Sequence, residues 1–186
     1  MANGFEKASQ PASAGICLAC GLCCNGVIFA DLKLQSGDDI ERLRSLGLTV
    51  SVRRGLRRGP ALAQPCAALE GCRCRVYADR PAYCRQFECV LLKSVQAGRT
   101  RHAEALRIVA TARERAEKVR GLLRELGDRE EATALSVRFR RTTTRLKATE
   151  LSEETAARYG ELTLAVHDLN LLIGDAFYPG DGGRGG

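Results

Sequence analysis

Apolar side chains in the second half of the chain recur at steps of three and four residues, the spacing of an amphipathic helix. The first stripe consists of Leu106, Val109, Ala112, Ala116, Val119, Leu123 and Leu126. The second consists of Tyr159, Leu162, Val166, Leu169 and Ile173. Gly127 is expected to end the first helix, and Ser152 is expected to begin the second, with two glutamates in its first turn. We expect these two helices to pack on each other or to cover the first half of the chain.

The segment between the two stripes has a different pattern. Its apolar residues alternate with polar ones, which predicts an extended segment. These residues are Leu135, Val137 and Phe139. The same segment carries arginines at positions 138, 140, 141 and 145. Such a run either binds phosphate groups or forms a solvated face, and we favour the solvated face.

The first half of the chain has short periodic segments separated by turn residues. Residues 36–47 predict a short helix that begins at an N-cap, Ser36, and ends at Gly47. Residues 48–52 alternate and predict a brief strand. Residues 81–96 predict a helix, because the first of them is a proline, which is favoured at the first helical position.

These elements predict a mainly α fold with irregular loops. A small cysteine-rich domain is expected at residues 15–95, followed by a helical region at 96–178 in which amphipathic helices form a hairpin. Residues 1–14 and 179–186 are expected to be flexible termini, because they are short and rich in small and polar residues.

Composition agrees with an ordinary globular chain. The 186 residues are 45% hydrophobic, which is enough for a core, although there is no Trp. The formal net charge of +7 treats every thiol as neutral. Four thiolates around one divalent ion carry a net charge of −2, so two such sites would lower the total to about +3. The basic balance is therefore weak evidence for nucleic acid, and we expect no nucleic-acid partner.

The chain shows no sign of membrane targeting. The first 15 residues contain no apolar stretch typical of a signal peptide, and no segment approaches the roughly 20 apolar residues of a membrane span. We therefore expect a cytoplasmic protein with no membrane partner. Thiols stay reduced in that compartment, which favours metal or redox chemistry over a disulfide framework.

The cysteines carry the strongest chemical signal. All nine lie in the first half of the chain, and four of them fall within eight residues. Their positions are Cys17, Cys20, Cys23, Cys24, Cys66, Cys72, Cys74, Cys84 and Cys89. Two thiolates with two residues between them can reach the same ion, because the chain turns back between them. Clustered thiolates of this kind predict a bound metal centre, either a zinc ion or an iron–sulfur cluster.

Two details of the first run bear on its geometry. Gly21 suits a tight turn with positive φ that leaves backbone N–H groups free to donate to sulfur. Neighbouring side chains usually diverge, so Cys23 and Cys24 are expected to serve two different metals, unless one of them ligates and the other does not. The first three cysteines have the spacing of bacterial ferredoxins, but the fourth ferredoxin position is absent.

Two blocks of the sequence resemble a known family. They are Cys17-x2-Cys20-Gly-x-Cys23-Cys24, then Pro65-Cys66-x2-Leu69 with Cys74-x-Val-Tyr77-x2-Arg80-Pro81-x2-Cys84-Arg85-x-Phe87-x-Cys89. Together they are similar to the YkgJ-like cysteine-cluster family (CxxCxxCC), a zinc- or iron-chelating domain, over about residues 15 to 90. The resemblance implies eight metal ligands: Cys17, Cys20, Cys23, Cys24, Cys66, Cys74, Cys84 and Cys89.

Other residues near the blocks are weaker candidates. Cys72 has no counterpart in the family pattern and is expected to be a buried or free thiol. Arg80 and Arg85 are candidates for hydrogen bonds to the thiolates or for offsetting their charge, and Tyr77 for packing around the site. The two histidines, at positions 102 and 167, are minor candidates as ligands.

Two classes of function remain open at this point. The first is a metal-binding module, in which the metal helps the cysteine-rich half to fold. The second is an iron–sulfur redox or metalloenzyme component. The sequence has no nucleotide-binding loop and no catalytic triad, so we name no catalytic residue and leave open whether the protein is an enzyme. The helical region is a candidate surface for a protein partner.

Overall fold

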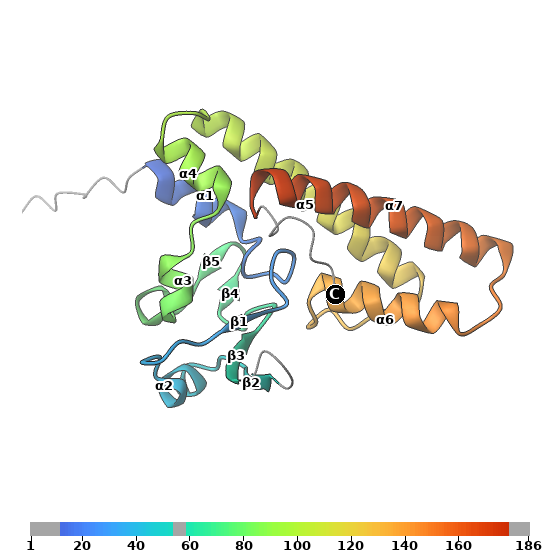
Figure 1. Ribbon diagram of the computed structural model, residues 1–186, viewed down its shortest axis with the longest axis horizontal. Helices are drawn as coiled ribbons and strands as arrows, with labels where there is room; N and C mark the ends of the chain where they lie inside the picture. Colours follow the sequence, from blue (N-terminus) through green and yellow to red (C-terminus); the bar gives the residue numbers. More distant parts are fainter. Residues whose placement is uncertain (1–11, 54–58, 179–186) are drawn as a thin grey trace, which may run out of the picture.

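The computed structural model describes residues 12–53 and 59–178. Long helices form one side of the molecule, and short elements that carry the cysteines form the other (Figure 1). Helices α5 (His102–Glu125) and α7 (Glu153–Ala176) pack against each other, and α6 (Leu135–Lys147) lies beside the far end of α5. The mainly α fold with irregular loops is confirmed.

The two helices predicted from apolar stripes are both present. Their stripe residues are buried or half-buried, and most belong to one core between α5, α6 and α7. Gly127 has a φ of +84° just after α5, and Ser152 is the N-cap of α7. The Ser152 hydroxyl accepts a hydrogen bond from the backbone N–H of Thr155 at 3.3 Å. The local signals at both helix ends therefore gave the correct boundaries.

The prediction of an extended segment at Leu135, Val137 and Phe139 is wrong. These residues lie in helix α6, which buries a different set of positions at steps of three and four: Leu135, Arg138, Thr142 and Leu146. Two members of that buried face are polar. The helical period is hidden in the sequence because a buried arginine and threonine interrupt the apolar stripe.

The arginine-rich stretch is not a uniformly solvated face. The Arg138 side chain is 1% exposed and donates to the Asp128 carboxylate at 2.9 Å, and the Asp128 side chain is 3% exposed. Arg141 donates to the other carboxylate oxygen at 2.5 Å. Arg145 donates to the backbone oxygen of Leu126, at the end of α5. The stretch thus ties α6 to the α5–α6 connection, and within it Arg140 is fully on the solvent side.

The cysteine-bearing side opens with helix α1 (Ala12–Cys20) and contains an antiparallel sheet in the order β1-β3-β2. The strands are β1 (Asp31–Lys33), β2 (Val50–Arg53) and β3 (Gly59–Ala63). The predicted strand at 48–52 corresponds to β2. The predicted helix at 36–47 is shorter, because α2 (Ile40–Ser45) takes Asp39 as its N-cap rather than Ser36.

Short elements follow the sheet and carry the remaining cysteines. They are β4 (Leu69–Glu70), β5 (Arg73–Cys74), the 3-10 turn η2 (Tyr77–Asp79), α3 (Ala82–Gln86) and α4 (Val90–Gln96). The single helix predicted for residues 81–96 is therefore broken in two. Phe87 is extended, and Cys89 caps the start of α4.

The apolar core continues across the boundary expected near residue 95. One buried cluster joins Ile16 and Leu22 of the first half to Val109 of α5 and to Phe177, just after α7. The backbone N–H of Val90 also donates to the Phe177 carbonyl at 3.1 Å. The cysteine-bearing part is thus packed directly on the long helices. The division at 95 and the flexible termini stay predictions, and most of those termini lie outside the described residues.

Candidate metal centre

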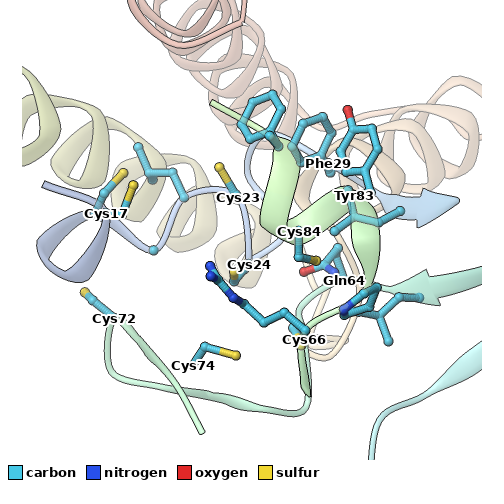
Figure 2. A pocket seen from close by; sticks show the side chains of 18 of the residues that line it. Cys17, Cys23, Cys24, Phe29, Gln64, Cys66, Cys72, Cys74, Tyr83 and Cys84 are labelled. Carbon is cyan, nitrogen blue, oxygen red and sulfur yellow. The ribbon is translucent and has the colours of Figure 1, made fainter. Parts of the chain in front are cut away.

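All nine cysteines line one pocket of about 140 Å³. The pocket lies between the α1 end, the short β4–β5 hairpin and helix α3, and Figure 2 shows the sulfur atoms around it. Its other walls include Arg80 and the buried side chain of Gln64. Two sequence blocks more than 40 residues apart therefore meet at one place, as the resemblance implied.

A sharp turn after α1 places the first block. Gly21 has a φ of +68°, and its carbonyl accepts the backbone N–H groups of Cys24 and Asn25, each at 3.0 Å. A Cβ atom at Gly21 would also lie 3.3 Å from the Cα of Cys72. The expectation of a positive-φ glycine is confirmed, and the close approach to Cys72 is a second reason for a residue without a side chain.

A second contact holds the two blocks together. The backbone N–H of Cys66 donates to the Cys24 carbonyl at 2.7 Å. This bond brings the segment after β3 against the first cysteine run, so that thiols of both blocks face the same pocket.

The cysteines fall into two sets when their mutual charge effects are compared. Burial is the largest cause of the raised pKa of Cys23, followed by the charges of Cys20, Cys24, Cys89 and Cys17. Burial and then Cys89 raise the pKa of Cys17. The same kind of interaction links Cys20 to Cys89 and Cys17. We call this group the first set: Cys17, Cys20, Cys23 and Cys89.

The remaining neighbours form a second set. The pKa of Cys24 is raised by burial and then by the charges of Cys66, Cys84 and Cys74. Burial and then Cys66 and Cys74 raise the pKa of Cys84. The second set is Cys24, Cys66, Cys74 and Cys84. Cys23 and Cys24, which are adjacent, also act on each other, but the other charges on Cys23 come from the first set and the largest ones on Cys24 come from the second.

Burial makes these thiols hold their protons firmly. It raises the pKa of Cys20 and of Cys24 to about 12, and that of Cys84 to about 11. Backbone donors oppose this effect at three cysteines. The N–H of Leu22 lowers the pKa of Cys20, that of Ala68 lowers the pKa of Cys66, and Cys89 Sγ accepts the N–H of Leu92 at 3.4 Å. A cation in the pocket would supply the compensation that a thiolate needs there.

The raised pKa values predict that the metal-free, reduced protein loses stability in alkali. An unfolded thiol titrates near 8.5, so below about pH 8.5 the thiols are protonated in both the folded and the unfolded chain. In that range their titration does not lower the free energy of unfolding. As the pH rises from about 8.5 towards 11 to 12, the unfolded chain loses protons that the folded chain retains, and the free energy of unfolding falls.

Urea unfolding of the metal-free protein at pH 7, 8.5, 10 and 11, with reductant present, checks this prediction. Cys24→Ala is the matched variant and should show a shallower decline, since it lacks one of the thiols with a strongly raised pKa. Equal slopes for the wild type and the variant would contradict it.

Three arginines act on the thiols, and of these only Arg80 was expected. Burial raises the pKa of Cys66, and the charge of Arg75 partly opposes that effect. Arg80 lowers the pKa of Cys17 and of Cys84, so its charge acts on both sets. Its guanidinium carbon sits 3.6 Å from the centre of the Tyr77 ring, and its Nε donates to the Tyr77 carbonyl at 3.0 Å. Arg113 of α5 donates to Cys72 Sγ at 3.0 Å. No sequence signal marks Arg113 among the many arginines of its helix.

The other weaker candidates lie elsewhere. Arg85 is exposed on α3 and is not among the residues that line the pocket. His102 is exposed at the start of α5, next to Gly15, and His167 is exposed on α7. Neither histidine lines the pocket.

Aromatic rings close the pocket beside the second set. Phe29 meets Tyr83, Phe87 and Tyr178 edge to face, with ring centres 5.0–5.9 Å apart. Tyr83 and Phe87 stack at 5.9 Å. Burial, followed by the charges of Tyr178, Cys23 and Cys84, raises the pKa of the Tyr83 phenol. Sequence analysis identified Phe87 in the motif but not the other rings.

The donor set suits a thiophilic metal, but the side chains do not yet form a coordination shell. Within residues 12–53 and 59–178, no three side chains of His, Cys, Asp or Glu are arranged to hold an ion as they stand. Rotation of the cysteine side chains within the pocket would be needed to bring four sulfur atoms to one ion. All-thiolate ligands are those that zinc and iron–sulfur clusters prefer.

Comparison with protein families agrees with this chemistry. The model of the CxxCxxCC family, described as a "putative zinc- or iron-chelating domain", matches residues 16–116. The chain belongs to this family, and the resemblance seen in the sequence is confirmed. No match was found among curated proteins or solved structures. Within the described part of the chain, none of the helices has the length and apolar character needed to cross a membrane.

Proposed function

We propose that this protein binds two thiophilic metal centres, one at each set of four cysteines. The first set would supply Cys17, Cys20, Cys23 and Cys89, and the second Cys24, Cys66, Cys74 and Cys84. The observation that carries the proposal is the convergence of both cysteine blocks on one pocket. Apart from the effects of Cys24 on Cys23 and of Cys20 on Cys24, the mutual charge effects of the eight thiols fall within two groups of four.

Charge supports two centres of this kind. Two divalent ions, each with four thiolates, would give the pocket a net charge of about −4. The guanidinium of Arg80 offsets part of that charge, because it acts on one thiol of each set. Because the thiols retain their protons when no cation is present, metal binding should release protons. Metal affinity should therefore rise with pH.

A site with four thiolates leaves no open coordination position, so it is poorly suited to hydrolysis. Two roles fit such a site. A zinc ion would cross-link the irregular segment between β3 and α4. In this segment, all of which the structure describes, strand pairing is limited to the two residue pairs of β4 and β5. An iron–sulfur cluster in the same sets would carry electrons. We infer that fastening this segment is the basic role of the metal.

Anaerobic purification followed by elemental analysis tests the proposal. About two zinc ions per colourless chain, or a brown protein with iron and sulfide, would support thiolate-bound centres and identify the metal. A reduced, full-length protein that takes up neither zinc nor iron, even when supplied in excess, would refute it.

Cys72 is expected to be dispensable. Its charge has a smaller effect on the pKa of Cys20 than those of Cys89 and Cys17, and its sulfur accepts a hydrogen bond from Arg113. Cys74, in contrast, acts on Cys24, Cys66 and Cys84. Cys72→Ser should retain the full metal content, and Cys74→Ser should lose the second centre. Elemental analysis of the two variants measures this difference. Loss of metal in Cys72→Ser with retention in Cys74→Ser would shift the ligand assignment by two residues.

A further inference from the structure

Gln64 is a buried side chain with no partner in the described part of the chain. The residue is 3% exposed, and neither its Nε2 nor its Oε1 has a hydrogen-bond partner there. A buried carboxamide without partners is costly, and native proteins rarely keep one without a use. Gln64 lines the pocket with the cysteines, and Figure 2 shows its carboxamide towards Cys84.

The backbone holds this side chain firmly in place. The N–H of Gln64 donates to the Ala30 carbonyl at 3.2 Å, at the end of strand β3. Two residues later, the N–H of Cys66 donates to the Cys24 carbonyl. The backbone around Gln64 is therefore fixed on both sides, which keeps the residue beside the second set.

We propose that Gln64 is a positioning residue that donates a hydrogen bond to a thiolate of the second set when metal is bound, Cys84 being the nearest candidate. This inference rests on the proposed metal sites. A carboxamide turned by half a rotation exchanges its oxygen for its NH₂ without changing shape. The same side chain can thus turn its N–H towards a thiolate once a metal is bound. Groups of this kind around a metal orient its ligands and favour the ligating form.

The proposal predicts effects of opposite sign with and without metal. Gln64→Met keeps the length of the side chain and removes both polar groups. In the metal-free protein it should raise the melting temperature by a few degrees, because an unpaired buried amide is removed. In the loaded protein it should weaken metal binding at the second set by about 10- to 100-fold.

Cobalt(II) is a suitable probe, because its thiolate complexes absorb visible light. Anaerobic titration of the reduced full-length protein with cobalt(II), in competition with a chelator, gives the affinity and the charge-transfer spectrum, and thermal unfolding of the metal-free protein gives the melting temperature. Gln64→Glu is a second variant that keeps the shape but, when ionised, only accepts hydrogen bonds, so it should also weaken binding. Gln86→Leu, at an exposed glutamine of α3, is the control and should change neither quantity.

A higher melting temperature together with weaker cobalt binding and a shifted charge-transfer band would support the proposal. A higher melting temperature with unchanged cobalt binding would overturn it, because Gln64 would then be an unpaired group without a ligand role. Lower stability of metal-free Gln64→Met would also overturn it, since the side chain would then act in packing. If wild-type protein binds no cobalt at the second set, the metal proposal itself fails, which is a separate result.

Discussion

Cys23→Ser should remove one metal centre, and Cys24→Ser should remove the other, although the two residues are adjacent. The two thiols act on each other, but apart from that the charges on Cys23 are those of Cys20, Cys89 and Cys17, whereas the largest charges on Cys24 are those of Cys66 and Cys84. Elemental analysis should show the metal content falling from about two ions per chain to about one in each single variant, because a tetrahedral thiolate site rarely survives the loss of a ligand.

Pairs of substitutions give the sharper test, since changes within one site do not add whereas changes at separate sites do. Cys23→Ser combined with Cys17→Ser should still retain one centre. Cys23→Ser combined with Cys66→Ser should retain none, and Cys72→Ser serves as the control that retains both. Retention of a centre by the second pair, or loss of both centres by the first, would mean that the cysteines are grouped differently.

Asp128→Asn should destabilise the fold by about 3–5 kcal/mol, because it leaves the charge of Arg138 buried without an opposite charge beside it. Burial alone would raise the pKa of Asp128, but hydrogen bonds from Arg141 and Arg138 hold it below its usual value. The stabilisation that the Asp128 carboxylate gives the fold is therefore present above about pH 4, where the carboxyl of the unfolded chain ionises. It is lost as the pH falls through the lower pKa of the folded state.

Urea unfolding of wild type and variant at pH 7 and at acid pH measures both effects, and the difference should shrink in acid. Glu131→Gln, which breaks an exposed pair with Arg124, is the control and should cost less than about 1 kcal/mol. Metal content should not change in either variant. A cost below about 1 kcal/mol for Asp128→Asn would show that Arg138 finds another partner.

The parts of the fold that depend on local signals were predictable from the sequence. Apolar stripes gave α5 and α7, a serine before two glutamates gave the start of α7, and the spacing of the first cysteine run required the positive φ of Gly21. The cysteine positions also indicated metal chemistry, because few other uses explain four thiols in eight residues.

Features that depend on distant contacts could not be predicted in this way. Helix α6 buries Arg138 and Thr142, and these positions make sense only beside Asp128, which lies ten or more residues away. Helix α1 lies in the cysteine run, where Ile16 and Cys20 bury against α5 without an obvious stripe. Gln64 looks like an ordinary polar residue before a proline until the chain is folded around it.

The matched family segment stops at residue 116, in the middle of α5, whereas the core beside the first cysteine run is completed by Phe177, which is 1% exposed at the end of α7. The segment that carries the family's cysteines therefore does not close its own core in this chain. A chain cut at the edge of the matched segment would lose Phe177 and all of α7, so Ile16 and Leu22 would be left partly uncovered and the truncated protein should aggregate rather than fold.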